Sequence, residues 1–503
     1  MKVADVFKFK DDRMKVLHYT WLAFFISFLT WYNMAPLATT MLEEMNWLTA
    51  QHIAALGILN VALTIPARII IGNLLDRHGP RLVYSSLLIV MSIPAFIFAF
   101  ADNWLQLMIS RLVLGSIGAS FVIGIRMVSE WFPPKEVGFA EGIYGGWGNF
   151  GSAAAAMILP VIGLHLFGGD NGWRYALALT GLICLVYGVF YFWAVKDTPE
   201  GKALVKPKRS GAMEVSTWGD MFRLIVWSIP LGGALAVSAW RIENLGFISE
   251  SALYLIWILI GLAFIIQVYK ILEVNIPILK AGVPKEDQYK FKNVAALNST
   301  YFANFGAELA IVSMLPMFFQ LTFSLSPSTA GLIAASFAFI NLIARPLGGM
   351  LSDRMGNRKR VMLVYMLGIS AGLLGMGFID SNWPLFAAVM MTILTSMFIQ
   401  GAEGATFAVI PMIKKRITGQ IAGMAGAYGN VGATIYLTLY TFVSPQTFFF
   451  TLAAGGLISF AICFFWLEEP NNSFSSEYYL SEQDRQTNEA PRVKESIRER
   501  KAL

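Results

Sequence analysis

Apolar runs of about twenty residues, separated by short polar connections, follow one another along most of the sequence. Twenty residues of helix, rising 1.5 Å each, span roughly the 30 Å hydrocarbon core of a bilayer. Of the 503 residues, 56% are hydrophobic and 14% are charged, whereas a soluble domain usually carries about 25% charged residues. This pattern excludes an ordinary soluble enzyme and predicts an all-α membrane protein.

Two sets of six spanning candidates can be distinguished. The first set lies at 17–37, 51–75, 82–101, 104–126, 139–163 and 173–195. The second set lies at 295–321, 328–350, 361–378, 384–411, 421–443 and 446–467. We therefore expect an N-terminal six-helix bundle over 17–195 and a C-terminal six-helix bundle over 295–467, flanked by cytoplasmic segments 1–16 and 468–503.

Two further apolar runs, 222–242 and 251–272, lie in the central linker 196–294. They form either an extra hairpin, which gives about fourteen spans, or two helices on the membrane surface. Charge in the first run is confined to its ends, at Arg223 and Arg241, so this run lacks the charged face of an interfacial helix. We prefer the spanning hairpin.

Lysine and arginine gather in every second connection. These basic connections are 2–15, 77–81, Lys135, 196–209, 280–292, 354–360 and 414–416. Because such residues stay on the cytoplasmic side, we predict a multi-pass protein of the plasma (inner) membrane with both termini cytoplasmic. The net charge of +6 is then a topology signal, and no nucleic acid partner is expected. Both cysteines lie inside apolar runs, so neither a disulfide framework nor a metal site is predicted.

An internal repeat relates the two sets of six. The segment Arg68-Ile-Ile-Ile-Gly-Asn-Leu-Leu-Asp-Arg-His-Gly-Pro-Arg81 recurs as Arg345-Pro-Leu-Gly-Gly-Met-Leu-Ser-Asp-Arg-Met-Gly-Asn-Arg358, with seven identities at an offset of 277. At an offset of 281, Gly142, Gly145, Gly148, Asn149 and Gly151 recur as Gly423, Gly426, Gly429, Asn430 and Gly432. Two parallel repeats with a site at their interface are the arrangement of alternating-access carriers.

The stretch from Gly72 to Arg81 and its copy from Gly349 to Arg358 resemble the G-x-x-x-D-R-x-G-x-R loop of the major facilitator superfamily. The likeness extends over nearly the whole chain apart from the central hairpin and the tail. It implies a fold of two pseudo-symmetric six-helix bundles and a cytoplasmic gate at this loop. The gate residues would be Asp76, Arg77, Arg81, Asp353, Arg354 and Arg358.

Arg68 and Arg345 each precede the gate aspartate by eight residues, about 12 Å of helix, which puts both inside the bilayer. An arginine at the midplane costs on the order of 2.5–3.5 kcal/mol. Planar, permanently charged guanidinium groups with forked donors suit the oxygens of a small flat oxyanion, so we expect an anion clamp. The alternative is two structural arginines satisfied by backbone carbonyls or carboxylates.

Asn149 and Asn430 lie roughly 15 Å from the cytoplasmic ends of their spans, close to the level of the arginines. Their carboxamides can donate hydrogen bonds to a substrate without adding charge. Glycines spaced three and four residues apart surround them and let a neighbouring helix approach closely. These glycines are Gly145, Gly148, Gly151, Gly426, Gly429 and Gly432. A pure packing seam is the alternative reading of both segments.

The segments Gly145-Gly-Trp-Gly-Asn-Phe-Gly151 and Gly426-Ala-Tyr-Gly-Asn-Val-Gly432 resemble the paired signatures of the nitrate/nitrite porter family, on its fifth and eleventh spans. The second departs from the commoner glycine-rich form at Ala427. The first and seventh spans are also similar to that family, and the chain most resembles its cyanobacterial type. The resemblance implies nitrate held between two arginines by hydrogen bonds and aromatic contacts. The residues implied are Arg68, Arg345, Asn149, Tyr301, Phe305 and Tyr32.

Two carboxylates, Glu308 and Glu403, also lie inside predicted spans. A carboxylate in hydrocarbon needs a partner, so both are candidates for a coupling proton site or a counter-charge to the arginines. The alternative is a fixed ion pair that only shapes the bundle.

Together these patterns predict a secondary active transporter that takes up nitrate and nitrite with protons by alternating access. The alternatives are nitrate/nitrite exchange, transport of another small anion, and a non-transporting anion receptor. No catalytic residue, cofactor or metal is expected, because the sequence shows no nucleophile elbow, phosphate loop or metal-ligand cluster. We expect the protein to function as a monomer surrounded by membrane lipid.

Overall fold

The computed structural model describes residues 3–202, 204, 207, 211–325, 327–440 and 442–469, and over these residues the fold is all-α. The first half contains α1 (Asp12–Trp31), α2 (Ala38–Glu44), α3 (Ala50–Ala62), α4 (Thr64–His78), α5 (Pro80–Ala99), α6 (Trp104–Leu114), α7 (Ser120–Trp131), α8 (Val137–Val161) and α9 (Gly172–Ala194). The central helices are α10 (Trp218–Val226), α11 (Ile229–Asn244) and α12 (Glu250–Ala281). The second half contains α13 (Phe291–Phe323), α14 (Pro327–Phe339), α15 (Asn341–Arg354), α16 (Arg358–Gly377), α17 (Leu385–Ile413), α18 (Thr418–Tyr440) and α19 (Pro445–Trp466).

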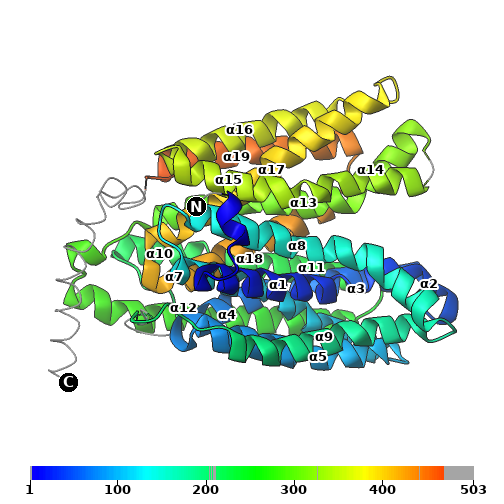
Figure 1. The fold of residues 1–503 in the computed structure, drawn as a ribbon, viewed down its shortest axis with the longest axis horizontal. Coiled ribbons are helices and arrows are strands. Elements are labelled where there is room, and N and C mark those ends of the chain that lie inside the picture. The colour runs from blue at the N-terminus through cyan, green and yellow to red at the C-terminus, as the bar shows by residue number, and fades with distance from the viewer. Residues whose placement is uncertain are drawn as a thin grey trace.

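The long helices run side by side along the long axis of the molecule (Figure 1). Within the described residues, thirteen helical segments are long and apolar enough to cross a membrane, as a multi-pass membrane protein requires. Trp218–Asn244 and Glu250–Ala281 are among them, so the central hairpin has the length and composition of a spanning pair. α18 is not among the thirteen, and its residues from Thr418 to Thr434 are all buried. Its glycine- and asparagine-containing surface therefore faces protein.

Two seams join the halves. In the α8–α15 seam, α8 packs against α15, and in the α4–α18 seam, α18 packs against α4. Glycines make both approaches possible, because a Cβ at Gly142 would lie 2.6 Å from the backbone oxygen of Arg345. A Cβ at Gly423 would lie 2.5 Å from the backbone oxygen of Arg68. Each signature helix thus runs directly past the arginine of the opposite half.

The second span of each half is interrupted at the equivalent place. α4 begins at Thr64 and α15 begins at Asn341, each four residues before the arginine, at Arg68 and Arg345. A single residue separates each of these helices from the helix before it. The internal repeat therefore extends to the break in the helix as well as to the charge that follows it.

The basic connections 77–81, 354–360 and 414–416 lie at one end of the bundle, which we call the basic end. Hydrogen bonds join the end of α4 to the start of α18 and the end of α15 to the start of α8 at this place. The start of α1 and the end of α19 lie at the same end, on the left in Figure 1. The halves are thus in contact with each other where the basic residues gather.

The central hairpin covers the outside of the α4–α18 seam. α11 packs against α3, α4 and α18, and α12 lies against α10 and α11. The hydroxyl of Tyr428, in the second signature, donates to the backbone oxygen of Trp227 at 2.5 Å. At the basic end, Arg416 pairs with Glu214 at 2.7 Å and with Asp287 at 2.8 Å. The linkers on both sides of the hairpin therefore bind the connection that leads into α18.

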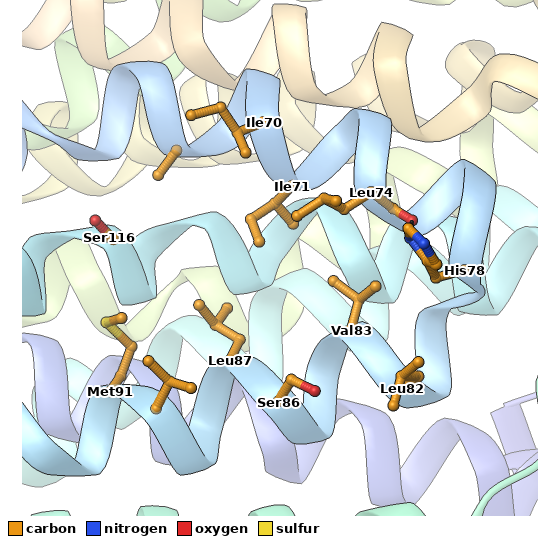
Figure 2. Close-up of a pocket in the computed structure, with 12 residues that line it drawn as sticks. Ile70, Ile71, Leu74, His78, Leu82, Val83, Ser86, Leu87, Met91 and Ser116 are labelled. Carbon is orange, nitrogen blue, oxygen red and sulfur yellow. Dashed lines mark hydrogen bonds between the residues drawn. The ribbon is translucent and has the colours of Figure 1, made fainter. Parts of the chain in front are cut away.

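An apolar groove of about 440 Å³ lies between α4 and α5 (Figure 2). Its lining includes the exposed side chains of Ile70, Leu74 and Val90, and His78 at its end is the one ionisable residue in the lining. A groove of this kind, open on the outer face of a bundle, suits contact with lipid. It lacks the cations that an anion site requires.

Candidate anion-binding site

Arg345, on α15, is compensated by a carboxylate. Its Nη1 atom lies 2.7 Å from Oε2 of Glu403 on α17. Its Nη2 atom donates a hydrogen bond to the hydroxyl of Tyr301 on α13 at 3.0 Å. All three side chains are buried. On this side of the site, the guanidinium has both a counter-ion and a neutral hydrogen-bond partner.

Arg68, on α4, is held by backbone carbonyls. Its Nε atom donates to the oxygen of Gly118 at 3.2 Å, and its Nη1 atom donates to the oxygen of Gly426 on α18. Among the described residues no carboxylate lies within ion-pair distance of it. Carbonyl dipoles solvate the guanidinium but leave its charge in place, so Arg68 remains an uncompensated buried cation.

The two guanidinium groups meet at one aromatic ring. Cζ of Arg68 lies 5.7 Å and Cζ of Arg345 lies 5.1 Å from the ring centroid of Phe121 on α7. Arg68 is also 5.4 Å from the ring of Phe305 on α13. The arginines of the two halves therefore converge on one place inside the bundle, as the clamp prediction requires.

The aromatic residues of this place form a parallel stack. The rings of Phe121 and Tyr301 are inclined by 3° and those of Tyr301 and Phe305 by 4°, with centroids 6.1 Å and 5.0 Å apart. Phe407 on α17 meets Phe121 and Tyr301 edge-on at 4.5 Å and 4.7 Å. Tyr32, the other aromatic residue predicted at the site, ends α1 and packs against Phe28 and Trp31.

The two signature asparagines are buried and under-satisfied. Oδ1 of Asn149 has no hydrogen-bond partner, and neither Nδ2 nor Oδ1 of Asn430 has one within the described part of the chain. Buried amides are normally hydrogen-bonded, and an unmet one calls for a ligand or water. The glycine one turn before each asparagine faces an arginine. A Cβ at Gly145 would lie 2.7 Å from Nε of Arg345, and a Cβ at Gly426 would lie 3.1 Å from Cδ of Arg68.

Glu308, on α13, belongs to the same cluster. Its Oε1 atom accepts a hydrogen bond from Nδ2 of Asn341 at 2.8 Å and one from Nε2 of Gln400 at 3.5 Å. Its carboxyl group is close enough to Glu403 for the two to interact. Both carboxylates predicted from the sequence therefore lie beside Arg345, and neither is an ion-pair partner of Arg68.

A third internal repeat, which the sequence analysis missed, relates the fourth and tenth spans. Residues 115–121 are Gly-Ser-Ile-Gly-Ala-Ser-Phe and residues 401–407 are Gly-Ala-Glu-Gly-Ala-Thr-Phe, at an offset of 286. Both copies end in a phenylalanine of the aromatic cluster, Phe121 or Phe407. This signal in the sequence could have predicted both rings.

The same repeat shows where the halves differ. Glu403 occupies the position equivalent to Ile117. The carboxylate that neutralises Arg345 therefore has no counterpart beside Arg68. Two equivalent arginines stand in electrostatically different halves, and this asymmetry is a property of the sequence and not of one conformation.

The predicted gate aspartates link the halves through backbone hydrogen bonds. Asp76 accepts from the N–H groups of Gly419 and Gln420, at 3.1 and 3.0 Å, in the first turn of α18. Asp353 accepts from Gly138 and Phe139, at 3.1 and 2.8 Å, in the first turn of α8. A carboxylate at a helix N-terminus satisfies free N–H groups and matches the helix dipole. Each half thus caps a helix of the other.

Buried arginines support both caps. Arg126 on α7, which the sequence analysis did not single out, lies 3.5 Å from Asp76 and 3.0 Å from Glu130. Arg358 lies 2.9 Å from Asp353 and donates to the backbone oxygen of Pro134 at 2.6 Å. Arg126 was not predictable from the repeat, because no equivalent arginine stands in the tenth span.

The other predicted gate residues lie outside this contact. Arg77 and Arg354 are exposed and form no ion pair within the described part of the chain. Arg81 is partly buried with its guanidinium 4.8 Å from the ring of Phe192, and its backbone N–H donates to Asp197. Of the six gate residues, Asp76, Asp353 and Arg358 are the ones that bridge the two halves.

Two pseudo-symmetric helical halves with a pair of arginines between them define a membrane transporter of the major facilitator fold. Solved structures share this fold. The proton:xylose symporter XylE aligns with a TM-score of 0.60 and 15% identity over 91% of this chain and 96% of its own. A variant of the E. coli fucose:proton symporter FucP aligns with a TM-score of 0.57 and 12% identity over 89% of this chain and 98% of its own.

Sequence relatives are closer. The family model of the Major Facilitator Superfamily matches residues 20–284 and 297–496. The nitrate/nitrite transporter NrtP of Nostoc punctiforme is 46% identical over 475 residues, 93% of this chain and 95% of its own. High-affinity nitrate transporter 2.3 of Oryza sativa subsp. japonica is 29% identical over 87% of this chain and 73% of its own. The chain belongs to the Major Facilitator Superfamily and to its nitrate/nitrite transporter family, and it is a transporter and not an enzyme.

Proposed function

We propose that this chain takes up nitrate and nitrite across the plasma (inner) membrane by alternating access, coupled to protons. The relatives named nitrate or nitrite transporters support the substrate class. The observation that carries the mechanism is the unequal compensation of the two arginines. Glu403 lies 2.7 Å from Arg345, whereas no carboxylate of the described residues lies within ion-pair distance of Arg68.

The anion binds between the guanidinium groups, where Arg68 supplies the free charge. Each guanidinium offers forked donors to a planar oxyanion. Asn149, Asn430 and the hydroxyl of Tyr301 supply further hydrogen bonds, and the rings of Phe121 and Phe305 line the site beside Arg68. A weakly hydrated planar anion loses little on leaving water for such a site.

Charge balance supports proton coupling. Two arginines and two ionised carboxylates, Glu308 and Glu403, make an empty site that is formally neutral. A nitrate ion adds one negative charge, which a low-dielectric interior disfavours. One proton on a carboxylate restores neutrality, and a protonated Glu403 leaves Arg345 free to bind the anion. Nitrate and a proton therefore enter the site together.

The basic end faces the cytoplasm in this proposal, since basic connections stay on that side. Both termini are then cytoplasmic, and the Asp76 and Asp353 caps close the inner side. Opening toward the cytoplasm releases α18 and α8 from these carboxylates and exposes the site. The protein acts as a monomer in lipid, because the site lies between the two halves of one chain.

Uptake of labelled nitrate into proteoliposomes tests the proposal. An imposed gradient of one pH unit is expected to drive about ten-fold accumulation by one-to-one symport. Arg68→Lys and Arg345→Lys keep the charge but lose the fork, and both are expected to lower nitrate affinity. Accumulation that ignores the pH gradient and requires internal nitrite would instead assign the chain as an exchanger. Binding without any uptake would assign a receptor.

A further inference from the structure

Glu141, on α8, is a third carboxylate inside the bundle and was not singled out by the sequence analysis. Its side chain is 2% exposed, and neither carboxylate oxygen has a hydrogen-bond partner within the described part of the chain. Burying an unpaired ionised carboxylate is strongly unfavourable, so a group at this position carries a proton, which it can release when water enters. The binding site and the gate, as described so far, do not use it.

The position of Glu141 follows from its neighbours on α8. A Cβ on Gly138, one turn nearer the helix start, would lie 2.5 Å from Oδ1 of Asp353. A Cβ on Gly145, one turn further along, would lie 2.7 Å from Nε of Arg345. Residues three and four apart share a helix face. Glu141 therefore lies in the α8–α15 seam, between the gate aspartate and the site arginine.

The charges that act on Glu141 come from this seam. Asp353 on α15 and Arg358 at the start of α16 are the two that interact with its carboxylate. The helices packed against α8 carry other ionisable groups, which lie nearer the site or nearer the ends of the bundle. They are Arg345 and Arg354 on α15, Glu403 on α17, Arg126 and Glu130 on α7, Asp12, Arg13, Lys15 and His18 on α1, Arg174 on α9, and His165 in the π-helix Ile162–Phe167.

The α4–α18 seam has no carboxylate at the position equivalent to Glu141. At the offset of 281 that relates the signatures, the residue equivalent to Glu141 is Ala422. The residue equivalent to Glu403 is Ile117. The α8–α15 seam and the helix beside it therefore carry carboxylates at the site, in the middle and at the gate, whereas the pseudo-equivalent seam and its neighbour carry them only at the gate, at Asp76 and Glu130.

We infer that the α8–α15 seam is the proton pathway from the anion site to the basic end, with Glu141 as the intermediate acceptor. This inference rests on the proposed proton coupling. When Asp353 leaves the start of α8, water reaches Glu141, which is about one helical turn, or 6 Å, below the level of Gly145, and takes its proton. The O–H bond on Glu403 then breaks as a new one forms on the ionised Glu141. No electron is transferred, and Glu403 regains Arg345 as its partner.

The test compares two activities of Glu141→Gln in proteoliposomes. Nitrate exchange at equal pH on both sides needs no net proton movement, and it is expected to persist. Accumulation driven by one pH unit, about ten-fold in the wild type, is expected to fall to no accumulation, and the rate of net uptake to lose its dependence on pH. Glu136→Gln makes the same chemical change just before α8, where the carboxylate pairs with Arg13 at 3.3 Å, and is expected to match the wild type.

The outcomes separate the two proposals. If the wild type shows no accumulation driven by a pH gradient, the proposed symport fails. If the wild type accumulates nitrate and Glu141→Gln does so equally, with an unchanged pH profile, the proton pathway is wrong while symport stands. Glu141→Asp keeps a titratable group and is expected to restore part of the accumulation. Loss of nitrate exchange in both Glu141→Gln and Glu141→Asp would show that Glu141 is needed for packing, and would overturn the inference.

Discussion

Arg68 of the first half donates a hydrogen bond to the backbone oxygen of Gly426 in the second half. The contact places a buried cation of the candidate site, contributed by one half, directly on the signature helix of the other half. Any movement of the halves that separates α4 from α18 must break it. The anion site and the contact between halves are therefore built from the same atoms.

Alanine at the signature glycines is expected to weaken nitrate binding by displacing the arginines. The added Cβ would lie 2.7 Å from Arg345 at position 145 and 3.1 Å from Arg68 at position 426, so Gly145→Ala is the more severe change. Overpacking costs about 1–3 kcal/mol, which corresponds to a loss of affinity of about five-fold or more for Gly145→Ala. Gly261→Ala is the control, because nothing lies within 4 Å of its added Cβ. Equal affinity in all three variants would contradict the site.

Glu403→Gln is expected to uncouple nitrate binding from pH. In the wild type, an ionised Glu403 competes with nitrate for Arg345, so affinity falls as the pH rises. Glutamine cannot ionise, and the variant is expected to bind nitrate about ten-fold more tightly than the wild type at alkaline pH, with a flat pH profile. Equilibrium binding of labelled nitrate across pH measures both. A variant that keeps the wild-type slope would exclude Glu403 as the competing group.

Asparagine at either gate aspartate is expected to open the basic end more often. Asp76→Asn and Asp353→Asn weaken a cross-half helix cap by about 1 kcal/mol, or five-fold in population. Ala422→Cys, buried in α18 near the Asp76 contact, reports the opening through its rate of reaction with a thiol reagent. The native Cys184 and Cys463 are buried, which keeps the background low. If Ala422→Cys reacts no faster in the protein with Asp76→Asn than in the protein with native Asp76, the Asp76 cap does not hold the basic end closed.

The ion pair between Glu214 and Arg416 is expected to stabilise the protein by linking the hairpin to α18. A double-mutant cycle with Glu214→Gln and Arg416→Gln is expected to give a coupling free energy of about 1 kcal/mol in thermal unfolding in detergent. The exposed pair of Lys196 and Glu200, at 2.8 Å, is the comparison and is expected to give close to zero. Additive effects of the Glu214 and Arg416 changes would show that the hairpin is not anchored there.

The sequence was sufficient to predict the superfamily, the helical class and those residues that recur together in a short repeated segment of each half. Arg68 and Arg345 were found because their surroundings repeat at a single offset, and depth in the bilayer followed from helix geometry. The comparisons confirm the superfamily and the transporter class. The hairpin, the cytoplasmic termini and the roles of the site residues stay predictions.

Other features were out of reach for physical reasons. The recurrence of Phe121 as Phe407 was visible in the sequence, but the position of the Phe121 ring beside both arginines depends on how the two halves pack. Arg126 and Glu141 break the repeat, so a search for recurring residues passes over them. The exposure of Arg77 and Arg354 depends on which face of each helix end meets the other half, and a linear motif does not contain this information.

The break before each arginine, at the start of α4 and of α15, has a consequence for how the molecule opens. Each half has a joint, a one-residue break between two helices, just beyond the charged residue and on the side away from the basic end. The outer portions α3 and α14 can pivot at these joints while the guanidinium groups stay anchored. In the proposed alternating access, we therefore expect the outer entrance to widen by bending two helices, and the inner exit to open by separation of the two halves.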